Sequence, residues 1–439
     1  MWSRKRIDVG WADLIFAATR SPSSDDRALL AAEIEQRWSP AGQAVVCLSV
    51  RSAFDLLLSS LDLPAGSEIL VSAVTIGGML RIIAEHGHVA VPVDLDAHHL
   101  APRPDALARA LSPRTKVVLV AHLFGGRIDL RPVVEFARRN DLILIEDAAQ
   151  AYAGPTYTGH PTADVSLFSF GPIKTATALG GAIACVRDPQ LLMRMRRKQV
   201  DWPPQKRSAY LARVLKYAAL KASSSRPAYT ALLSACRAVG SNHDRLVNGS
   251  VRGFADGDFF VQIRRQPSAA LLSLLKRRLT GFDERRLSQR VRQAELLMAG
   301  WRGSSLFPGS ANEPHVHWML PLHTASPSRL IARLAAAGFD ATQGHSLTVV
   351  QPPRARPELD PIVARAVMAG IVFVPCYSGM SAPAVERLAR ILVDIAGQES
   401  DPLPSEVIVA HGEAAASPET APDNMYMPVA RQAGRCEAG

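Results

Sequence analysis

Two neighbouring segments decide the fold of this chain. They read LILIEDAAQAYAG over residues 142–154 and, after a short polar loop, VSLFSFGPIKTATALGGAI over residues 165–183. Each begins with a short apolar run of the length and composition of a buried β-strand. The first run ends in two acids, Glu146 and Asp147, and the second leads into a turn that contains Lys174.

An acid at one strand end and a lysine just beyond another are what a pyridoxal phosphate (PLP) site requires. Lys174 would hold PLP as a Schiff base and then move protons, and the Asp147 carboxylate would keep the ring nitrogen protonated. Ser169 lies in a Ser/Gly/Pro turn whose hydroxyl and N–H groups could hold the phosphate. Taken alone, such an Asp is often a cap and such a Lys is usually solvated, so the combination carries the prediction.

The motifs EDAAQA and SFGPIKTATALGGAI resemble the DegT/StrS family of PLP-dependent sugar aminotransferases, which have the aspartate aminotransferase (type I) fold. The resemblance implies that Asp147 pairs with the pyridine nitrogen and Gln150 approaches the ring hydroxyl. It also implies that Ser169 binds the phosphate and that Lys174 holds the cofactor. Relatives that act as dehydratases have His in place of this Lys, so Lys174 favours transamination.

The turn at residues 49–52, which leads into a helix predicted to begin at about Ser52, departs from the family pattern. The family has a Ser-Gly-Thr motif there, whose backbone cradles the phosphate at a helix N-terminus. This chain has Ser49, Val50, Arg51 and Ser52 instead. We expect Arg51 and Ser52 in the cofactor site, with Arg51 as a charged fork for the phosphate, although a surface Arg is an equal alternative. Ile76 replaces a residue that is often aromatic in the family, so it predicts aliphatic contact with the ring without stacking.

Other positions follow from the resemblance more loosely. His345 lies where the family has residues of the substrate mouth. Arg264 and Arg265 lie near the place of a family Asn that reaches the phosphate of the other subunit, and could serve an anion instead. His122 follows a buried strand, where a His is usually packed and hydrogen-bonded, so we do not assign it to catalysis.

Strands that alternate with helices predict an α/β fold, with a mostly parallel sheet between helices and catalytic residues at strand carboxyl ends. We expect an N-terminal arm (1–30), a large PLP-binding domain (31–265) and a smaller C-terminal α/β domain (266–397). Within the large domain, residues 188–256 predict a basic helical insertion. Residues 398–439 have no apolar periodicity and predict a disordered tail.

Composition narrows the class of protein. The chain has 439 residues, 48% of them hydrophobic and 21% charged, with a net charge of +10, which suits a globular two-domain enzyme. Zinc-finger spacing and basic stripes with interleaved aromatics are missing, so we expect no nucleic-acid partner. The five cysteines lack metal-ligand spacing, and we find no convincing signal peptide or spanning segment. These features predict a cytoplasmic protein.

The segment 205–221 leaves two interpretations open. Its apolar residues fall near helical spacing, with Arg213, Lys216 and Lys221 between them. Such a basic amphipathic helix could lie on an anionic membrane surface, which would make the protein membrane-peripheral. Alternatively, it packs on its own subunit or on a partner and exposes a solvated basic face, as charged helix faces usually do.

The sequence therefore predicts a PLP-dependent aminotransferase of polysaccharide or natural-product biosynthesis. By the resemblance, it would move an amino group from an amino acid, glutamate in the first place, to a nucleotide-linked keto-sugar, and it would form a homodimer with composite active sites. One alternative is a ketone of another kind, such as a cyclitol or a lipid- or carrier-linked ketone. Another is a PLP-fold binding protein without catalysis, against which the retained Asp147 and Lys174 argue.

Overall fold

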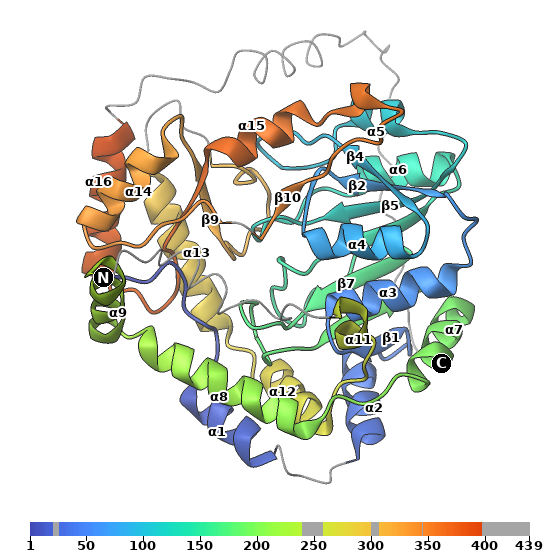
Figure 1. Cartoon of the computed structure of the whole chain (residues 1–439), viewed down its shortest axis with the longest axis horizontal. Helices are drawn as coiled ribbons and strands as arrows, with labels where there is room; N and C mark the ends of the chain where they lie inside the picture. Colours follow the sequence, from blue (N-terminus) through green and yellow to red (C-terminus); the bar gives the residue numbers. More distant parts are fainter. Residues whose placement is uncertain (21–25, 239–257, 300–306, 345, 397–439) are drawn as a thin grey trace, which may run out of the picture. The chain divides into compact units, whose positions relative to one another are not determined.

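A seven-stranded sheet forms the centre of the fold, and its strands follow in the order β1-β8-β7-β6-β5-β2-β4 (Figure 1). All of them run parallel except β8, which is antiparallel to both of its neighbours. In chain order they are β1 (Ala44–Cys47), β2 (Glu68–Ser72), β4 (Val89–Val93), β5 (Thr115–Ala121), β6 (Ile143–Asp147), β7 (Val165–Ser169) and β8 (Ala182–Val186). The predicted mostly parallel sheet is confirmed.

The structure is a computed structural model, and the residues that it describes belong to one compact unit. The described residues are 1–20, 26–238, 258–299, 307–344 and 346–396. Among them, no helix combines the length and the apolar character needed to cross a membrane. The predicted disordered tail lies outside the described residues.

Side chains alternate between the two faces of the sheet, as the period of a strand requires. On β5, Val117 and Leu119 belong to the hydrophobic cluster on one face, and Val118 and Val120 belong to the cluster on the other. The first face is covered by α3 (Val50–Leu61), α4 (Gly77–Glu85) and α7 (Pro189–Val200). The opposite face is covered near β4 by α5 (Pro104–Ala110) and α6 (Arg131–Arg139), and near β1 by α1 (Trp11–Arg20), α2 (Arg27–Trp38), α8 (Arg207–Ser223) and α12 (Ala269–Thr280).

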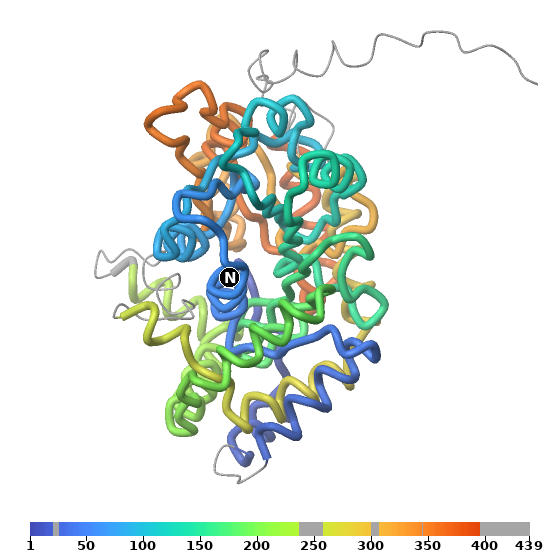
Figure 2. Tube along the Cα trace, turned by 90° about the vertical axis from the view of Figure 1, so that its right-hand side faces the viewer, coloured from blue at the N-terminus to red at the C-terminus, as the bar shows by residue number. Residues whose placement is uncertain are grey.

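Helix α8 shows how the chain uses its basic amphipathic segment. Tyr210, Val214 and Tyr217 are at most 1% exposed and lie in the cluster that α8 shares with α1 and α12. Figure 2 shows these helices together at the lower end of the view. Most of the apolar side that a membrane would bind is therefore used for packing within the chain, although Leu215 stays exposed.

A separate hydrophobic cluster lies toward the C-terminal end of the sequence. It is formed by α13 (Glu284–Ala299), β9 (Leu320–His323), α14 (Pro327–Ala336), β11 (Ile371–Val374) and α16 (Ala382–Ala396), with β9 and β11 paired antiparallel. The other elements are β3 (Val74–Thr75), paired with β10 (Thr348–Val349), and α9 (Arg226–Ala238), α11 (Phe259–Ile263), η1 (Pro357–Leu359) and α15 (Ile362–Gly370). The sequence places the boundary between the two domains after residue 265, and this boundary stays a prediction. Helix α12, which follows residue 265, packs with the helices of the large sheet.

Two helices differ from the sequence expectation. The N-terminal arm contains α1, whose Leu14 and Ala17 pack into the cluster of the large sheet. Helix α3 begins at Val50 and not near Ser52, because the Ser49 hydroxyl caps it by accepting a hydrogen bond from the Ser52 N–H at 3.1 Å.

Candidate active site at the carboxyl edge of the sheet

The predicted residues of the central stretch meet at one edge of the sheet. Asp147 ends β6 and Ser169 ends the parallel neighbour β7, while Lys174 lies in the turn between β7 and β8. Gln150 follows β6, and its Oε1 accepts a hydrogen bond from the Phe124 N–H, 2.9 Å away, in the loop after β5. Carboxyl ends of parallel strands are where α/β proteins place their ligands.

Glu146, the first acid of the pair, is a structural residue. It is fully buried, and its carboxylate accepts hydrogen bonds from the ring of His122 at 2.8 Å, the His160 N–H at 2.8 Å, and the hydroxyls of Ser166 and Tyr157. Burial opposes ionisation, but these hydrogen bonds and the His122 ring prevail and lower its pKa to about 2. Glu146 thus ties β5, β7 and the loop after β6 together.

Asp147 faces the opposite way along the strand and has a different environment. Its Oδ1 accepts a hydrogen bond from the Ala149 N–H at 2.9 Å. Burial raises the pKa of this carboxyl, while the Ala149 N–H and the Lys174 ammonium oppose the rise. Among the described residues, its other oxygen has no hydrogen-bond donor, so it can accept one from a ligand.

Lys174 is poised as a nucleophile. Its Nζ lies 4.0 Å from the centre of the Trp318 ring. Burial lowers its pKa to about 8, and the Arg51 guanidinium adds to the lowering while Asp147 opposes it. At pH 7 about a tenth of the amine is then unprotonated, far more than at the ordinary pKa of 10.5, and this is the form that attacks a carbonyl.

The N-terminus of α3 contributes Arg51, for which the sequence allowed either a phosphate-binding role or a place on the surface. Burial lowers the pKa of Arg51 and Asp147 raises it, so this guanidinium lies within electrostatic range of both Asp147 and Lys174 and is not a surface Arg. A Cβ on Gly78 would lie 2.7 Å from the Arg51 Nε, so only glycine leaves room for this side chain. The Ser52 hydroxyl is buried and lies 2.9 Å from the Ser49 hydroxyl, so it belongs to the helix cap.

Ile76 lies at the start of the helix that contains Gly78. It precedes α4 and packs, partly buried, against the hydrophobic cluster that includes α3. The predicted aliphatic contact with a bound ring stays a prediction.

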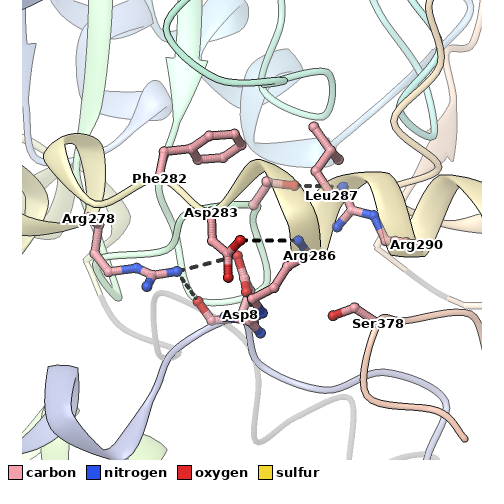
Figure 3. Close-up of a pocket in the computed structure, with 9 residues that line it drawn as sticks. Asp8, Arg278, Phe282, Asp283, Arg286, Leu287, Arg290 and Ser378 are labelled. Atoms are coloured by element: carbon pink, nitrogen blue, oxygen red, sulfur yellow. Dashed lines mark hydrogen bonds and ion pairs between the residues drawn. The ribbon is translucent and has the colours of Figure 1, made fainter.

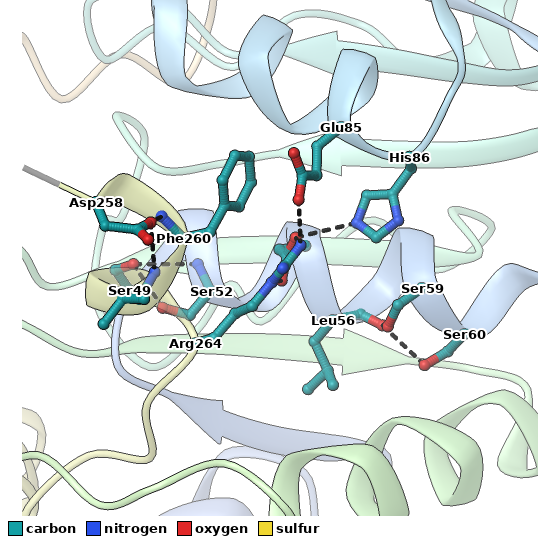
Figure 4. Close-up of polar contacts among 12 residues, drawn as sticks. Ser49, Ser52, Leu56, Ser59, Ser60, Glu85, His86, Asp258, Phe260 and Arg264 are labelled. Atoms are coloured by element: carbon teal, nitrogen blue, oxygen red, sulfur yellow. Dashed lines mark hydrogen bonds and ion pairs between the residues drawn. The ribbon is translucent and has the colours of Figure 1, made fainter.

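Arg264 has a role that the sequence did not predict. Its guanidinium makes a two-point ion pair with the buried Asp55 of α3 at 2.9 and 3.0 Å, and a longer contact with Glu85 at 3.3 Å (Figure 4). His86 lies 3.0 Å from the same Asp55 carboxylate. Arg264 therefore fastens α11 to α3 and α4 within one chain, which argues against the expectation that it serves an anion.

The other predicted positions have different outcomes. His345 lies outside the described residues. His122 is packed as expected, because its Nδ1 accepts a hydrogen bond from the Ile128 N–H at 3.2 Å while its Nε2 faces Glu146. A cluster of three or more His, Cys, Asp or Glu side chains fit to hold a metal is not found among the described residues.

Sequence reasoning missed the residues that surround the Lys174 turn from distant parts of the chain. Trp318, Arg290 and Asp8 reach it from three separate segments. Arg290 and Asp8 also line a cavity of about 30 Å³ together with Arg278 and Arg286 (Figure 3), which is room for about two water molecules. No local motif links these positions to Lys174, so the sequence held no signal for them.

The residues present fit PLP by their chemistry. Asp147 has an oxygen available for a protonated ring nitrogen, and Lys174 has a lowered pKa suited to a carbonyl. Arg51 and the N-terminus of α3 supply a positive end for a phosphate. Ser169 is partly exposed at the end of β7, where its Oγ lies 3.4 Å from the Gly171 N–H.

Comparison with known proteins finds a family match over part of the chain. Residues 32–218 match the sequence profile of the DegT/DnrJ/EryC1/StrS aminotransferase family, which confirms the resemblance for this segment. The match includes all of α7 and part of α8, so the predicted start of the insertion at residue 188 lies within it. Aminotransferases of this family depend on PLP, and the residues described above have the chemistry that PLP requires.

Curated relatives match part of the chain. GDP-perosamine synthase of Caulobacter vibrioides is 32% identical over 156 residues, which are 35% of this chain and 42% of that protein. L-glutamine:2-deoxy-scyllo-inosose aminotransferase of Streptomyces kanamyceticus is 34% identical over 149 residues, 33% of this chain and 35% of that protein. The chain therefore spans less than half the length of these relatives in the matched region.

Solved structures match over most of the chain. The aminotransferase TlmJ of Streptoalloteichus hindustanus has a TM-score of 0.64 and 20% identity, covering 89% of this chain and 97% of that one. The sugar aminotransferase CalS13 of Micromonospora echinospora has a TM-score of 0.63 and 18% identity, covering 90% and 100%. NtdA of Bacillus subtilis with bound cofactor PMP has a TM-score of 0.61 and 16% identity, covering 88% and 82%. The predicted α/β fold, in the form found in these aminotransferases, is confirmed.

Proposed function

We propose that this chain is a PLP-dependent aminotransferase that moves an amino group from an amino acid, glutamate in the first place, to a keto-sugar, most simply a nucleotide-linked one. The observation that carries the proposal is the pair of Asp147 and Lys174 at one sheet edge, with Lys174 at a pKa of about 8. Bound PLP supplies an electron sink that lets an amino group leave one substrate and join another.

Each residue has a defined task in this proposal. The Lys174 amine would hold the cofactor through its carbonyl group and, when free, would move a proton as general acid and base. The Asp147 carboxylate holds the ring nitrogen in its protonated form. Arg51 and the first turn of α3 bind the phosphate, in place of the family's Gly and Thr. Ser169, Gln150 and Ile76 contact the phosphate, ring hydroxyl and ring face as the resemblance implies.

The named relatives support the substrate classes. GDP-perosamine synthase and dTDP-4-dehydro-2,3,6-trideoxy-D-glucose 4-aminotransferase, the latter 32% identical over 160 residues, carry sugar nucleotides in their names. The Streptomyces relative names L-glutamine as amino donor and a cyclitol ketone as acceptor. Its similarity makes a cyclitol ketone the second candidate acceptor and glutamine the second donor.

We also propose a homodimer with active sites completed by both chains and a cytoplasmic location, on the family resemblance and the sequence composition. Light scattering of the purified protein tests the first point, since a monomer at working concentration contradicts it.

A single-turnover assay tests the proposed function. The full chain loaded with PLP is mixed with L-glutamate or L-glutamine, and the 2-oxo acid formed per chain is counted without any acceptor. We expect about one equivalent from the wild type and none from Lys174→Ala. A chain that binds PLP but forms no 2-oxo acid from either donor contradicts the aminotransferase proposal and supports the binding-protein alternative.

The acceptor is then identified by completing the cycle. The aminated protein is offered nucleotide-linked keto-sugars and, separately, 2-deoxy-scyllo-inosose, and return of the PLP spectrum is followed. Lys276→Ala is a matched control, because Lys276 pairs with Glu33 on the surface and has no part in the site. Recovery with the cyclitol alone would replace the keto-sugar by the second candidate.

A further inference from the structure

The turn that carries Lys174 is fastened to the N-terminal arm. The Asp8 carboxylate accepts a hydrogen bond from the Ala176 N–H at 2.9 Å. Ala176 has a φ of 54°, in the left-handed region that a residue with a Cβ rarely adopts. The Arg286 guanidinium lies 2.8 Å from the Asp8 carboxylate, and the Arg278 Nη2 donates to the Asp8 backbone carbonyl at 2.8 Å (Figure 3). One carboxylate thus links a strained turn residue to two arginines.

A second arm residue acts on the other side of Lys174. The indole N–H of Trp318 donates to the carbonyl of Ile173, which directly precedes Lys174, at 2.8 Å. The Lys5 ammonium donates to the Trp318 carbonyl at 2.8 Å and lies 3.8 Å from the centre of its ring. Lys5 and Lys174 therefore share the same tryptophan, on which Lys174 lies at 4.0 Å.

The arm residues that precede Lys5 are anchored to the C-terminal cluster. Trp2 forms a parallel bridge with Phe339 and is 7% exposed. Arg4 makes a two-point ion pair with Asp340 at 2.7 and 2.9 Å. The arm therefore runs from the C-terminal cluster to the lysine turn, with Lys5 and Asp8 as its contacts at the site.

We propose that Asp8 and Lys5 are positioning residues for Lys174, Asp8 by fixing the turn that carries this lysine and Lys5 by fixing the tryptophan against which the amine lies. The inference deepens the proposed function and rests on it for the role of Lys174. The two arm residues touch neither cofactor nor substrate in this account, and they act through Ala176 and Trp318.

The position of Lys5 supports a functional role. Burying the Lys5 ammonium costs solvation free energy. Burial therefore lowers the pKa of Lys5 well below its ordinary value, and the charges of Arg290 and Lys174 lower it further. Its hydrogen bonds go to the Trp318 carbonyl and to the Met319 sulfur at 3.3 Å. Perturbed buried amines of this kind are more common at functional sites than elsewhere.

The first measurement is the pH profile of Lys174 acetylation in the full chain freed of cofactor, read by peptide mass spectrometry. Lys276 in the same molecule is the internal reference. The charged groups that act on Lys174 are Asp147, Arg51 and Lys5. Asp147 and Arg51 remain in every variant, whereas Lys5→Met also removes a charge, so Asp8→Ala is the deciding variant. When the contact of Asp8 or Lys5 is lost, water can reach the Lys174 amine. The midpoint of Lys174 acetylation is therefore expected to rise from about 8 towards 10.5 in Asp8→Ala and in Lys5→Met.

The second measurement is hydrogen exchange at Ala176. Asp8→Ala is expected to speed its exchange roughly ten- to a hundred-fold, the range for losing a hydrogen bond to a charged group. Asp8→Asn keeps an oxygen for the Ala176 N–H and is expected to lie between the wild type and Asp8→Ala. This partial rescue separates positioning from a general loss of structure.

Matched controls come from the same chain. Asp129 pairs with the exposed Arg131 and has no contact with the lysine turn, so Asp129→Asn should leave both readouts unchanged. Lys198 is exposed and donates a hydrogen bond to the Ser59 carbonyl, so Lys198→Met is the control for Lys5→Met.

The proposal is overturned if Asp8→Ala and Asp129→Asn give the same acetylation midpoint and the same exchange at Ala176. If Asp8→Ala does not fold, Asp8→Asn decides by the same comparison. Both readouts are made without cofactor, so they stand even if the chain proves not to transaminate, and a failure of the single-turnover assay does not affect them.

Discussion

The adjacent acids Glu146 and Asp147 are expected to respond in opposite ways when each is replaced by its amide. Glu146 is buried with several donors and has a pKa lowered from 4.5 to about 2. Asp147 has a pKa raised by burial. The first carboxylate therefore stabilises the fold by being charged, and the charge of the second costs stability.

The magnitude for Glu146 follows from linkage. A lowering from 4.5 to about 2 corresponds to about 3.4 kcal/mol at 1.36 kcal/mol per pKa unit. This stability is fully present above pH 4.5 and is lost as the pH falls towards 2. Glu146→Gln is thus expected to lower the free energy of unfolding by about 3 kcal/mol at pH 7. At pH 4 this loss is expected to be smaller by about 0.8 kcal/mol.

Asp147→Asn is the matched variant. Because the pKa of Asp147 is raised, its charge destabilises the folded protein at pH values above the pKa of Asp in the unfolded chain. Removing the charge is therefore expected to leave the cofactor-free protein equally stable or more stable. The same variant should lose the single turnover with glutamate, because an amide does not keep the ring nitrogen protonated. Glu146→Gln should retain that turnover in molecules that are folded.

Urea unfolding followed by fluorescence and circular dichroism measures both variants, and coincident transitions justify a single free energy. Equal destabilisation by Glu146→Gln and Asp147→Asn would refute the division of roles. A Glu146→Gln effect that does not shrink between pH 7 and pH 4 would refute the linkage argument.

Other expected outcomes concern the cation at α3 and a tight turn. Arg51→Met should raise the midpoint of Lys174 acetylation above about 8, because Arg51 helps to lower this pKa, and it should weaken binding of inorganic phosphate; an unchanged midpoint in the same assay contradicts the placement of Arg51. Gly78→Ala should reproduce the Arg51→Met shift, since the new Cβ would lie 2.7 Å from the Arg51 Nε, whereas Gly77→Ala, which meets nothing within 4 Å, should not. Gly125→Ala, at a φ of 110° and with a Cβ 2.5 Å from the Trp318 backbone nitrogen, should lower the thermal midpoint and disturb Lys174 acetylation, and a wild-type profile would show that Trp318 does not set the lysine.

The sequence predicted the sheet and the central pair of residues because both depend on local patterns. Short apolar runs set the strands, and the acids and Lys174 follow strands whose ends share one edge. It also predicted that His122 is packed and hydrogen-bonded, as its bonds to Ile128 and Glu146 show.

The remaining features depend on contacts between distant segments, which no local pattern contains. Asp8 reaches Ala176 across 168 positions, and Trp318 reaches Ile173 across 145. Arg264 could not be assigned from its neighbours, because its partner Asp55 lies 209 positions away. The pattern of α8 fitted both a membrane face and a packed face, and the burial of Tyr210 and Tyr217 against other helices decides in favour of packing.

The most direct test of the account is to find where PLP attaches to the chain. The full-length protein is incubated with PLP, reduced with borohydride, digested and mapped by mass spectrometry. The account predicts one modified residue, Lys174, with no modification of Lys5, although both amines lie against Trp318. Modification of Lys5 in place of Lys174, or of neither, would contradict the assignment of the active site.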